Sequence, residues 1–224
     1  IGRALGERNP DQRRRRLLAA RVTLLRLLEQ YSNKLPLTLE ILDLDAQVAH
    51  AIGDAAGVRS AFERQQIVVR DRKDVPLFDR WLAASIARLT NIGHFDLART
   101  QLDVAILAES QPQRQGLCDL QVGDLFCQEG RMREAEAHYL ETAQRRPAVW
   151  ATAMIRAATL ARREGRLDVA ASRYRQVAES PGDTPERDLA RHAWPEMLAK
   201  IKENFETSAL PAEVAATSRK EQRK

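Results

Sequence analysis

The chain has 224 residues, of which 44% are hydrophobic, 30% are charged and only 5% are aromatic. Ala, Leu, Arg and Glu dominate this composition and are good helix formers, while the scarcity of aromatic residues excludes most all-β folds. No run of about 18 apolar residues occurs, so the sequence predicts no membrane span. The expected fold class is therefore all-α.

The net charge of +5 is distributed unevenly along the chain. Residues 1–36 carry +6, residues 37–206 carry −3, and the tail from residue 207 carries +2. The body of the protein is thus mildly acidic. Its net charge alone does not predict an acidic partner.

Helix start and stop signals divide the chain into helices of about 12 to 18 residues. The first helix is expected over Pro10–Tyr31, with Asn9 as its N-cap, and Pro36 opens the next one. Gly and Pro residues then separate apolar stretches as far as a last helix that Thr184 can cap. Because Pro195 lies inside this last helix, we expect a kink or two short helices there.

Single glycines separate successive apolar helices at spacings of 40, 37 and 35 residues: Gly53, Gly93, Gly130 and Gly165. This period predicts helical hairpins that must stack to bury their apolar faces. Mostly small residues stand five positions after these glycines, and large ones nine positions after: Val58, Ala98, Ala135 and Ala170, then Phe62, Leu102, Tyr139 and Tyr174. We expect the small residues to face small residues seven positions before each glycine, such as Gly123, and the large ones to fill the space to the next hairpin.

The segment from Val122 to Pro147 carries a Val-Gly pair, Phe126, Gly130, Ala135 and Tyr139, and it resembles the tetratricopeptide repeat. The units around Gly93 and Gly165 resemble this repeat as well, whereas the unit around Gly53 matches poorly. The resemblance implies an α-solenoid of helix-turn-helix repeats with capping helices at both ends.

The expected organisation starts with a basic segment and capping helix over residues 1–36. About four repeats follow over 37–184, at 39–72, 79–112, 116–149 and 151–184. A C-terminal capping helix is expected over 185–206, and a disordered tail over 207–224.

No catalytic, metal-binding or cofactor-binding constellation is evident. The four histidines lie 44, 44 and 54 residues apart: His50, His94, His138 and His192. In stacked hairpins we expect them not to converge on a metal. Cys118 and Cys127 lie more than about 13 Å apart along one expected helix, too far for a disulfide, and are interpreted as buried fillers. The sequence therefore predicts neither an enzyme nor a cofactor.

The run Arg13–Arg16 has two interpretations. It can contact phosphates or acidic lipids through charge-assisted hydrogen bonds, which leaves open a regulatory or nucleic-acid-associated domain as the alternative function. However, four consecutive residues face all sides of a helical turn, and no aromatic residues stand nearby to stack on bases. We favour a solvated helical turn, so nucleic acid is not the expected partner.

The resemblance also implies that the first helix of each hairpin lines a concave groove for a peptide or an amphipathic helix of another protein. The implied groove residues, with the apolar Leu120 and Ile155 among them, include Asp43, Gln47, Asn91, Asp124, Gln128, Thr159, Arg162 and Arg163. The Lys, Asn and Arg residues with which the family clamps a C-terminal carboxylate are mostly replaced here. An amphipathic helix is therefore a better match than a charged tail.

The leading hypothesis is a non-catalytic scaffold or adaptor, one module of a larger bacterial secretion or envelope assembly protein. The cytoplasm is favoured over the periplasm, which would require a leader or an upstream region before Ile1.

Overall fold

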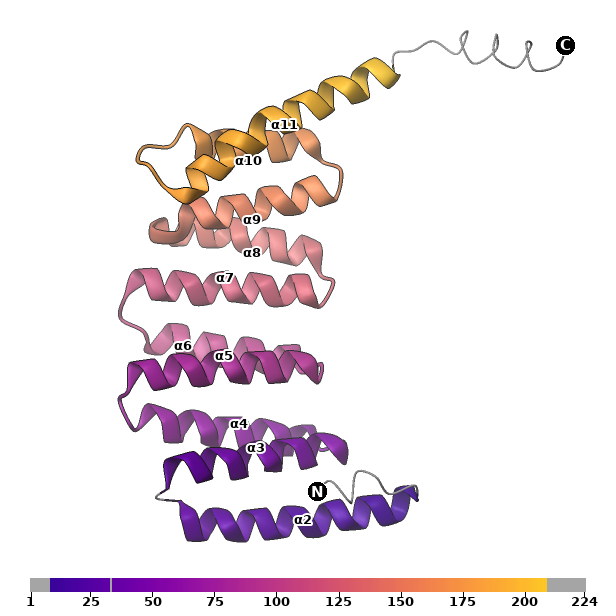
Figure 1. Cartoon of the computed structure of the whole chain (residues 1–224), viewed down its shortest axis with the longest axis vertical. Helices are drawn as coiled ribbons and strands as arrows, with labels where there is room; N and C mark the ends of the chain where they lie inside the picture. Colours follow the sequence, from indigo (N-terminus) through magenta and orange to yellow (C-terminus); the bar gives the residue numbers. More distant parts are fainter. Residues whose placement is uncertain (1–8, 33, 209–224) are drawn as a thin grey trace, which may run out of the picture. The chain divides into compact units, whose positions relative to one another are not determined.

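The computed structural model describes residues 9–32 and 34–208, with side chains described as far as residue 204 (Figure 1). These residues form ten α-helices and one short 3-10 helix, and they contain no strand. The elements are α2 (Pro10–Tyr31), α3 (Leu35–Ala51), α4 (Ala55–Arg70), α5 (Val75–Asn91), α6 (Phe95–Ala108), α7 (Pro112–Gln128), α8 (Met132–Arg145), η1 (Pro147–Val149), α9 (Trp150–Arg163), α10 (Leu167–Ala178) and α11 (Pro185–Ser208).

The chain divides into two compact units, and the boundary between Gln101 and Leu102 lies inside α6. In unit 1, α2 packs on α3, α3 on α4, and α4 on α5. In unit 2, each helix from α7 to α11 packs on the next, and α11 also contacts α9. Packing between consecutive helices confirms the predicted all-α, helical-repeat fold class.

The four periodic glycines form the turns inside the hairpins. Gly53, Gly93, Gly130 and Gly165 have φ between 76° and 82°, a left-handed conformation that favours glycine. At Gly130, the N–H donates to Cys127 O at 3.1 Å, and the following N–H donates to Phe126 O at 2.9 Å. These bonds satisfy carbonyl groups left open at the end of α7. The glycine period therefore predicted the hairpins correctly.

The predicted core positions are buried, but one of them has a different neighbour from the one expected. Ala135, Ala170, Tyr139 and Tyr174 all lie in the apolar core of unit 2. A Cβ added to Gly123 would stand 2.6 Å from Cδ1 and 2.9 Å from Cζ of Tyr139. The glycine therefore makes room for the aromatic ring within its own hairpin. The atoms nearest to this position therefore belong to Tyr139 and not to a small residue, because the ring turns back over α7 and donates a hydrogen bond from its hydroxyl to Asp124 of that helix.

Helix α2 is anchored to unit 1 by an arginine on its inner side. Arg21 Nε donates to Asp45 Oδ1 of α3 at 2.8 Å, and Arg21 Nη1 pairs with Asp54, the N-cap of α4. The Asp45 side chain is only 5% exposed, so its charge needs this partner. Gly57 lies against the guanidinium, and a Cβ there would stand 2.8 Å from Arg21 Cζ.

Both predicted terminal caps are present. Asn9 Oδ1 accepts hydrogen bonds from Asp11 N at 3.0 Å and Gln12 N at 3.2 Å. Thr184 Oγ1 accepts one from Arg187 N at 3.2 Å. Helix α11 continues through Pro195 as one helix rather than as two short ones, and it includes the first two residues of the expected tail. Residues 209–224, on which the rest of that prediction falls, lie outside the described residues.

Candidate functional site

In unit 1, the predicted groove residues include a carboxylate that already has partners. Asp43 Oδ2 accepts from Gln47 Nε2 at 3.0 Å, and the other oxygen pairs with Arg88. This ion pair joins α3 to α5, the first helices of two successive hairpins. Asn91 is exposed in the last turn of α5. Asp43 is therefore a brace between hairpins rather than a free ligand group.

The equivalent carboxylate of unit 2, that of Asp124, also has hydrogen-bond and ion-pair partners. Asp124 of α7 accepts from the hydroxyl of Tyr139 at 2.6 Å and pairs with Arg156 of α9. Burial, followed by the hydrogen bond to Asp124, raises the pKa of the Tyr139 hydroxyl, so this hydroxyl remains a donor. Cys127 Sγ lies 3.6 Å from the same hydroxyl oxygen. Sequence reasoning missed Arg156, although it lies one helical turn before Thr159 on the same face of α9.

The other predicted residues of unit 2 lie toward the ends of their helices. Gln128 is exposed at the end of α7, while Arg162 and Arg163 are exposed in the last turn of α9. Leu120 is 1% exposed and belongs to the core, so its expected place in the groove is wrong. That side chain is on the inner side of α7, where it packs within the core of unit 2.

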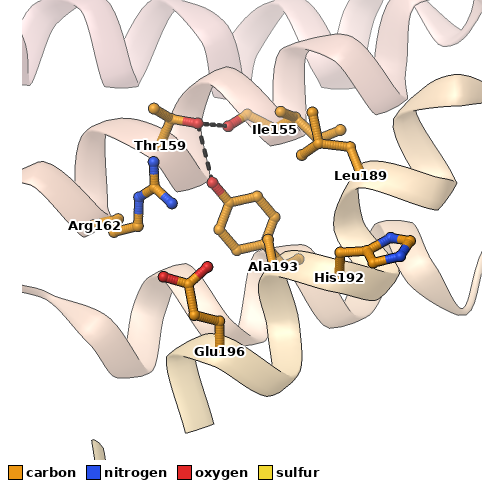
Figure 2. Close-up of a pocket in the computed structure, with 8 residues that line it drawn as sticks. Ile155, Thr159, Arg162, Leu189, His192, Ala193 and Glu196 are labelled. Atoms are coloured by element: carbon orange, nitrogen blue, oxygen red, sulfur yellow. Dashed lines mark hydrogen bonds between the residues drawn. The ribbon is translucent and has the colours of Figure 1, made fainter. Parts of the chain in front are cut away.

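A pocket of about 400 Å³ gathers three of the predicted residues with side chains from two further helices (Figure 2). Its lining comes from α9, α10 and α11: Ile155, Thr159, Arg162, Tyr174, Leu189, His192, Ala193 and Glu196. Sequence reasoning missed the contribution of α11, because this helix was interpreted only as a cap. Its residues at positions 189, 192, 193 and 196 follow helical spacing, which indicates one face.

Two hydroxyls at the pocket form a chain of hydrogen bonds with a fixed direction. Thr159 Oγ1 lies 2.8 Å from Ile155 O and 3.0 Å from the hydroxyl of Tyr174 (Figure 2). A carbonyl oxygen can only accept, so Thr159 donates its single hydrogen to Ile155. Tyr174 must then donate to Thr159, and its oxygen keeps the capacity to accept from a ligand.

The charges beside these hydroxyls are of opposite sign, and the positive charge of Arg162 contributes to lowering the pKa of Glu196. Glu196 Oε1 accepts from Lys200 Nζ at 2.9 Å, and this hydrogen bond is the main cause that lowers the pKa of Glu196. Among residues 9–32 and 34–204, whose side chains are described, Arg162 forms no ion pair with a carboxylate, although it lies near enough to Glu196 to act on its charge. Figure 2 shows Arg162 and Glu196 at one side of the pocket and His192 at the other. The pocket therefore offers a cation available for an incoming carboxylate.

His192 presents a defined nitrogen to the exterior. Its Nδ1 lies 2.7 Å from Asp188 O, and since that carbonyl can only accept, Nδ1 carries a hydrogen. In the neutral ring, Nε2 is therefore an acceptor.

Two of the four histidines meet, contrary to expectation. The ring centroids of His50 and His94 lie 5.6 Å apart, in an edge-to-face arrangement. His50 stands just before the glycine turn of one hairpin and His94 just after that of the next, so stacking brings the two turns together. Even so, no group of three metal-ligating His, Cys, Asp or Glu side chains occurs among the described residues.

No model of a known protein family matches the sequence, and no curated protein matches it. Within the helices that the structure describes, none has the length and apolar character needed to cross a membrane. The fold alone places the chain in the class of all-α helical-repeat proteins.

Proposed function

We propose that the chain is a non-catalytic protein-binding module of the tetratricopeptide type, which takes a helix or peptide of another protein along the first helices of unit 2. The glycine period and the repeated core positions support the family assignment. The expected role as one module of a bacterial secretion or envelope assembly remains part of this proposal. A preformed surface of packed helices binds with little ordering cost, because its own side chains are already held in place.

The observation that carries the proposal is the exposed guanidinium of Arg162, which lines the pocket and forms no ion pair among the described side chains. Ile155 and Leu189 supply apolar contact, and the oxygen of Tyr174 is free to accept a hydrogen bond. A ligand that matches these groups has an aliphatic side chain next to a Glu or Asp. The aliphatic residue and the acidic residue can lie on one face of a helix when they are three or four positions apart.

A selection with the full chain tests this assignment. A library of helix-forming peptides is displayed and selected for binding, and the affinities of the enriched peptides are measured by fluorescence anisotropy. We expect enriched peptides to carry an acidic residue three or four positions from an aliphatic one. Arg162→Glu should weaken their binding about tenfold, which corresponds to about 1.4 kcal/mol for a contact at the rim of an interface.

Arg163→Glu is the matched control, because Arg163 is also exposed in the last turn of α9 but does not line the pocket. It should change the affinity less than threefold. Equal effects of the two substitutions would indicate general electrostatic attraction rather than a contact in the pocket. Enriched peptides without an acidic residue would refute the assignment of Arg162.

A further inference from the structure

Helix α2 has a second apolar face that no described part of the chain covers. Leu18, Val22 and Leu25 are 45%, 50% and 37% exposed. They follow one another at spacings of four and three residues, so they form one stripe along two turns of the helix. A neighbouring side of α2, about 100° around the helix axis, is buried through Leu17 and Leu24. We refer to Leu18, Val22 and Leu25 as the outer stripe.

The packing of the other hairpins indicates what kind of element fits the outer stripe. Helices α4, α8 and α10 each pack against the helix before and the helix after them. Helix α2 also precedes a first helix, α3, but no described helix packs on it from the other side. Its outer stripe therefore resembles the surface with which the second helix of a hairpin contacts another helix.

The charges around the outer stripe indicate the chemistry of that partner. Arg14, Arg15 and Arg26 are exposed beside it, and among the described residues no carboxylate pairs with any of them. A helix that packs there brings its flanking residues close to these arginines, so acidic flanks are favoured over basic ones.

The same face disfavours a membrane as the occupant. Asp11 stands seven residues before Leu18, and Glu29 stands four residues after Leu25, so both continue the line of the outer stripe. Both are exposed. A membrane that covered the stripe would have to desolvate these carboxylates, whereas a helix that crosses α2 at an angle contacts only about two of its turns and leaves both carboxylates in water.

From this arrangement we infer that the outer stripe docks an amphipathic helix of a partner protein, one that has an aliphatic stripe and acidic flanks. This surface is separate from the pocket of unit 2, and the inference does not depend on the function proposed for that pocket.

Two synthetic peptides test the inference with the full chain. Both are 20-residue, Ala-rich helices with leucines at spacings of four and three. One has Glu and the other Lys beside the leucines, and binding is measured by fluorescence anisotropy. The Glu peptide is expected to bind at least tenfold more tightly than the Lys peptide. Val22→Glu should weaken its binding at least tenfold, whereas Ile67→Glu, at an exposed aliphatic residue of α4, should change it less than twofold.

A charge reversal keeps the test decisive if Val22→Glu fails to fold. The double variant Arg15→Glu/Arg26→Glu changes only exposed side chains, and it should invert the preference so that the Lys peptide binds more tightly. Because the Glu peptide also fits the ligand proposed for the pocket of unit 2, the measurements are repeated in an Arg162→Glu background, where binding at the outer stripe should persist. Loss of all binding in that background would place the peptide in the pocket of unit 2 and overturn the inference.

Other occupants give different results. Sedimentation with phosphatidylglycerol vesicles that Val22→Glu abolishes would identify a membrane surface. A dimer in analytical ultracentrifugation that Val22→Glu dissociates would identify a second copy of the chain. Binding of duplex DNA that the arginine reversal abolishes would identify nucleic acid. Any of these results, or equal affinity for the two peptides, overturns the inference.

Discussion

Replacement of Gly123 by alanine has two opposite effects on stability: a gain from helix propensity and a larger loss from packing. Alanine in the middle of α7 gains about 1 kcal/mol over glycine from helix propensity. The new methyl group would stand 2.6 Å from Cδ1 and 2.9 Å from Cζ of Tyr139, and closer still to Cε1. The ring cannot retreat easily, because it is 2% exposed and its hydroxyl is held by Asp124 at 2.6 Å. Overpacking of this kind costs about 3 kcal/mol, the upper end of the usual range.

The net expectation for Gly123→Ala is a destabilisation of about 2 kcal/mol and a decrease in Tm of about 4–8 °C. Urea unfolding followed by circular dichroism measures the change. In a Tyr139→Leu background the ring is gone, so Gly123→Ala should instead stabilise by about 1 kcal/mol. The two backgrounds differ by about 3 kcal/mol, which is the coupling between the two residues. If Gly123→Ala stabilises the protein in both backgrounds, the ring does not occupy the place of the missing Cβ.

Three further predictions concern the anchoring of α2 and the packing of α10. Arg21→Ala should lower the free energy of unfolding by about 3 kcal/mol, as measured by urea unfolding, because it leaves the carboxylate of Asp45 buried without its partner. An unchanged unfolding midpoint would show that α2 is held by apolar contact alone. The hydrogen bond from Arg21 is the main cause that lowers the pKa of Asp54 below its usual value of 3.8. This contact therefore stabilises the fold above that pH, and the stabilisation is lost as the pH falls through the pKa of the folded state. In Arg21→Ala, carboxyl NMR should show Asp54 titrating at a higher pH than in the parent. Ala170→Leu should cost about 1–3 kcal/mol with helix content retained, since Ala170 is fully buried in the core, and a variant that unfolds like the parent would contradict the close packing of α10.

The hairpins could be predicted from the sequence because their turns need a particular residue. A helix that ends in a left-handed turn favours glycine, so Gly130 and Gly165 mark the turns directly. The terminal caps could be predicted as well, because Asn9 and Thr184 accept hydrogen bonds from backbone N–H groups two or three residues away. Features that depend on local backbone geometry can thus be predicted from a single sequence.

The braces between hairpins could not be predicted in this way. Asp43 pairs with a residue 45 positions later, whereas Asp124 pairs with one 32 positions later. No fixed spacing connects such pairs, because the hairpins differ in length and the contact arises only when they stack. The pocket was partly hidden for the same reason: Leu189 and His192 come from α11, which lies outside the repeat pattern.

These braces also determine the charge that a partner of unit 2 encounters. Residues 37–206 carry −3 in total, which taken alone would disfavour an acidic ligand. However, charges beyond about 8 Å are screened at physiological salt, so the groups at the contact decide the sign. Asp124 is neutralised locally by Arg156, and Glu196 by Lys200. Arg162 is then the pocket charge that forms no ion pair among the described side chains, which is why we propose an acidic ligand for this mildly acidic repeat body.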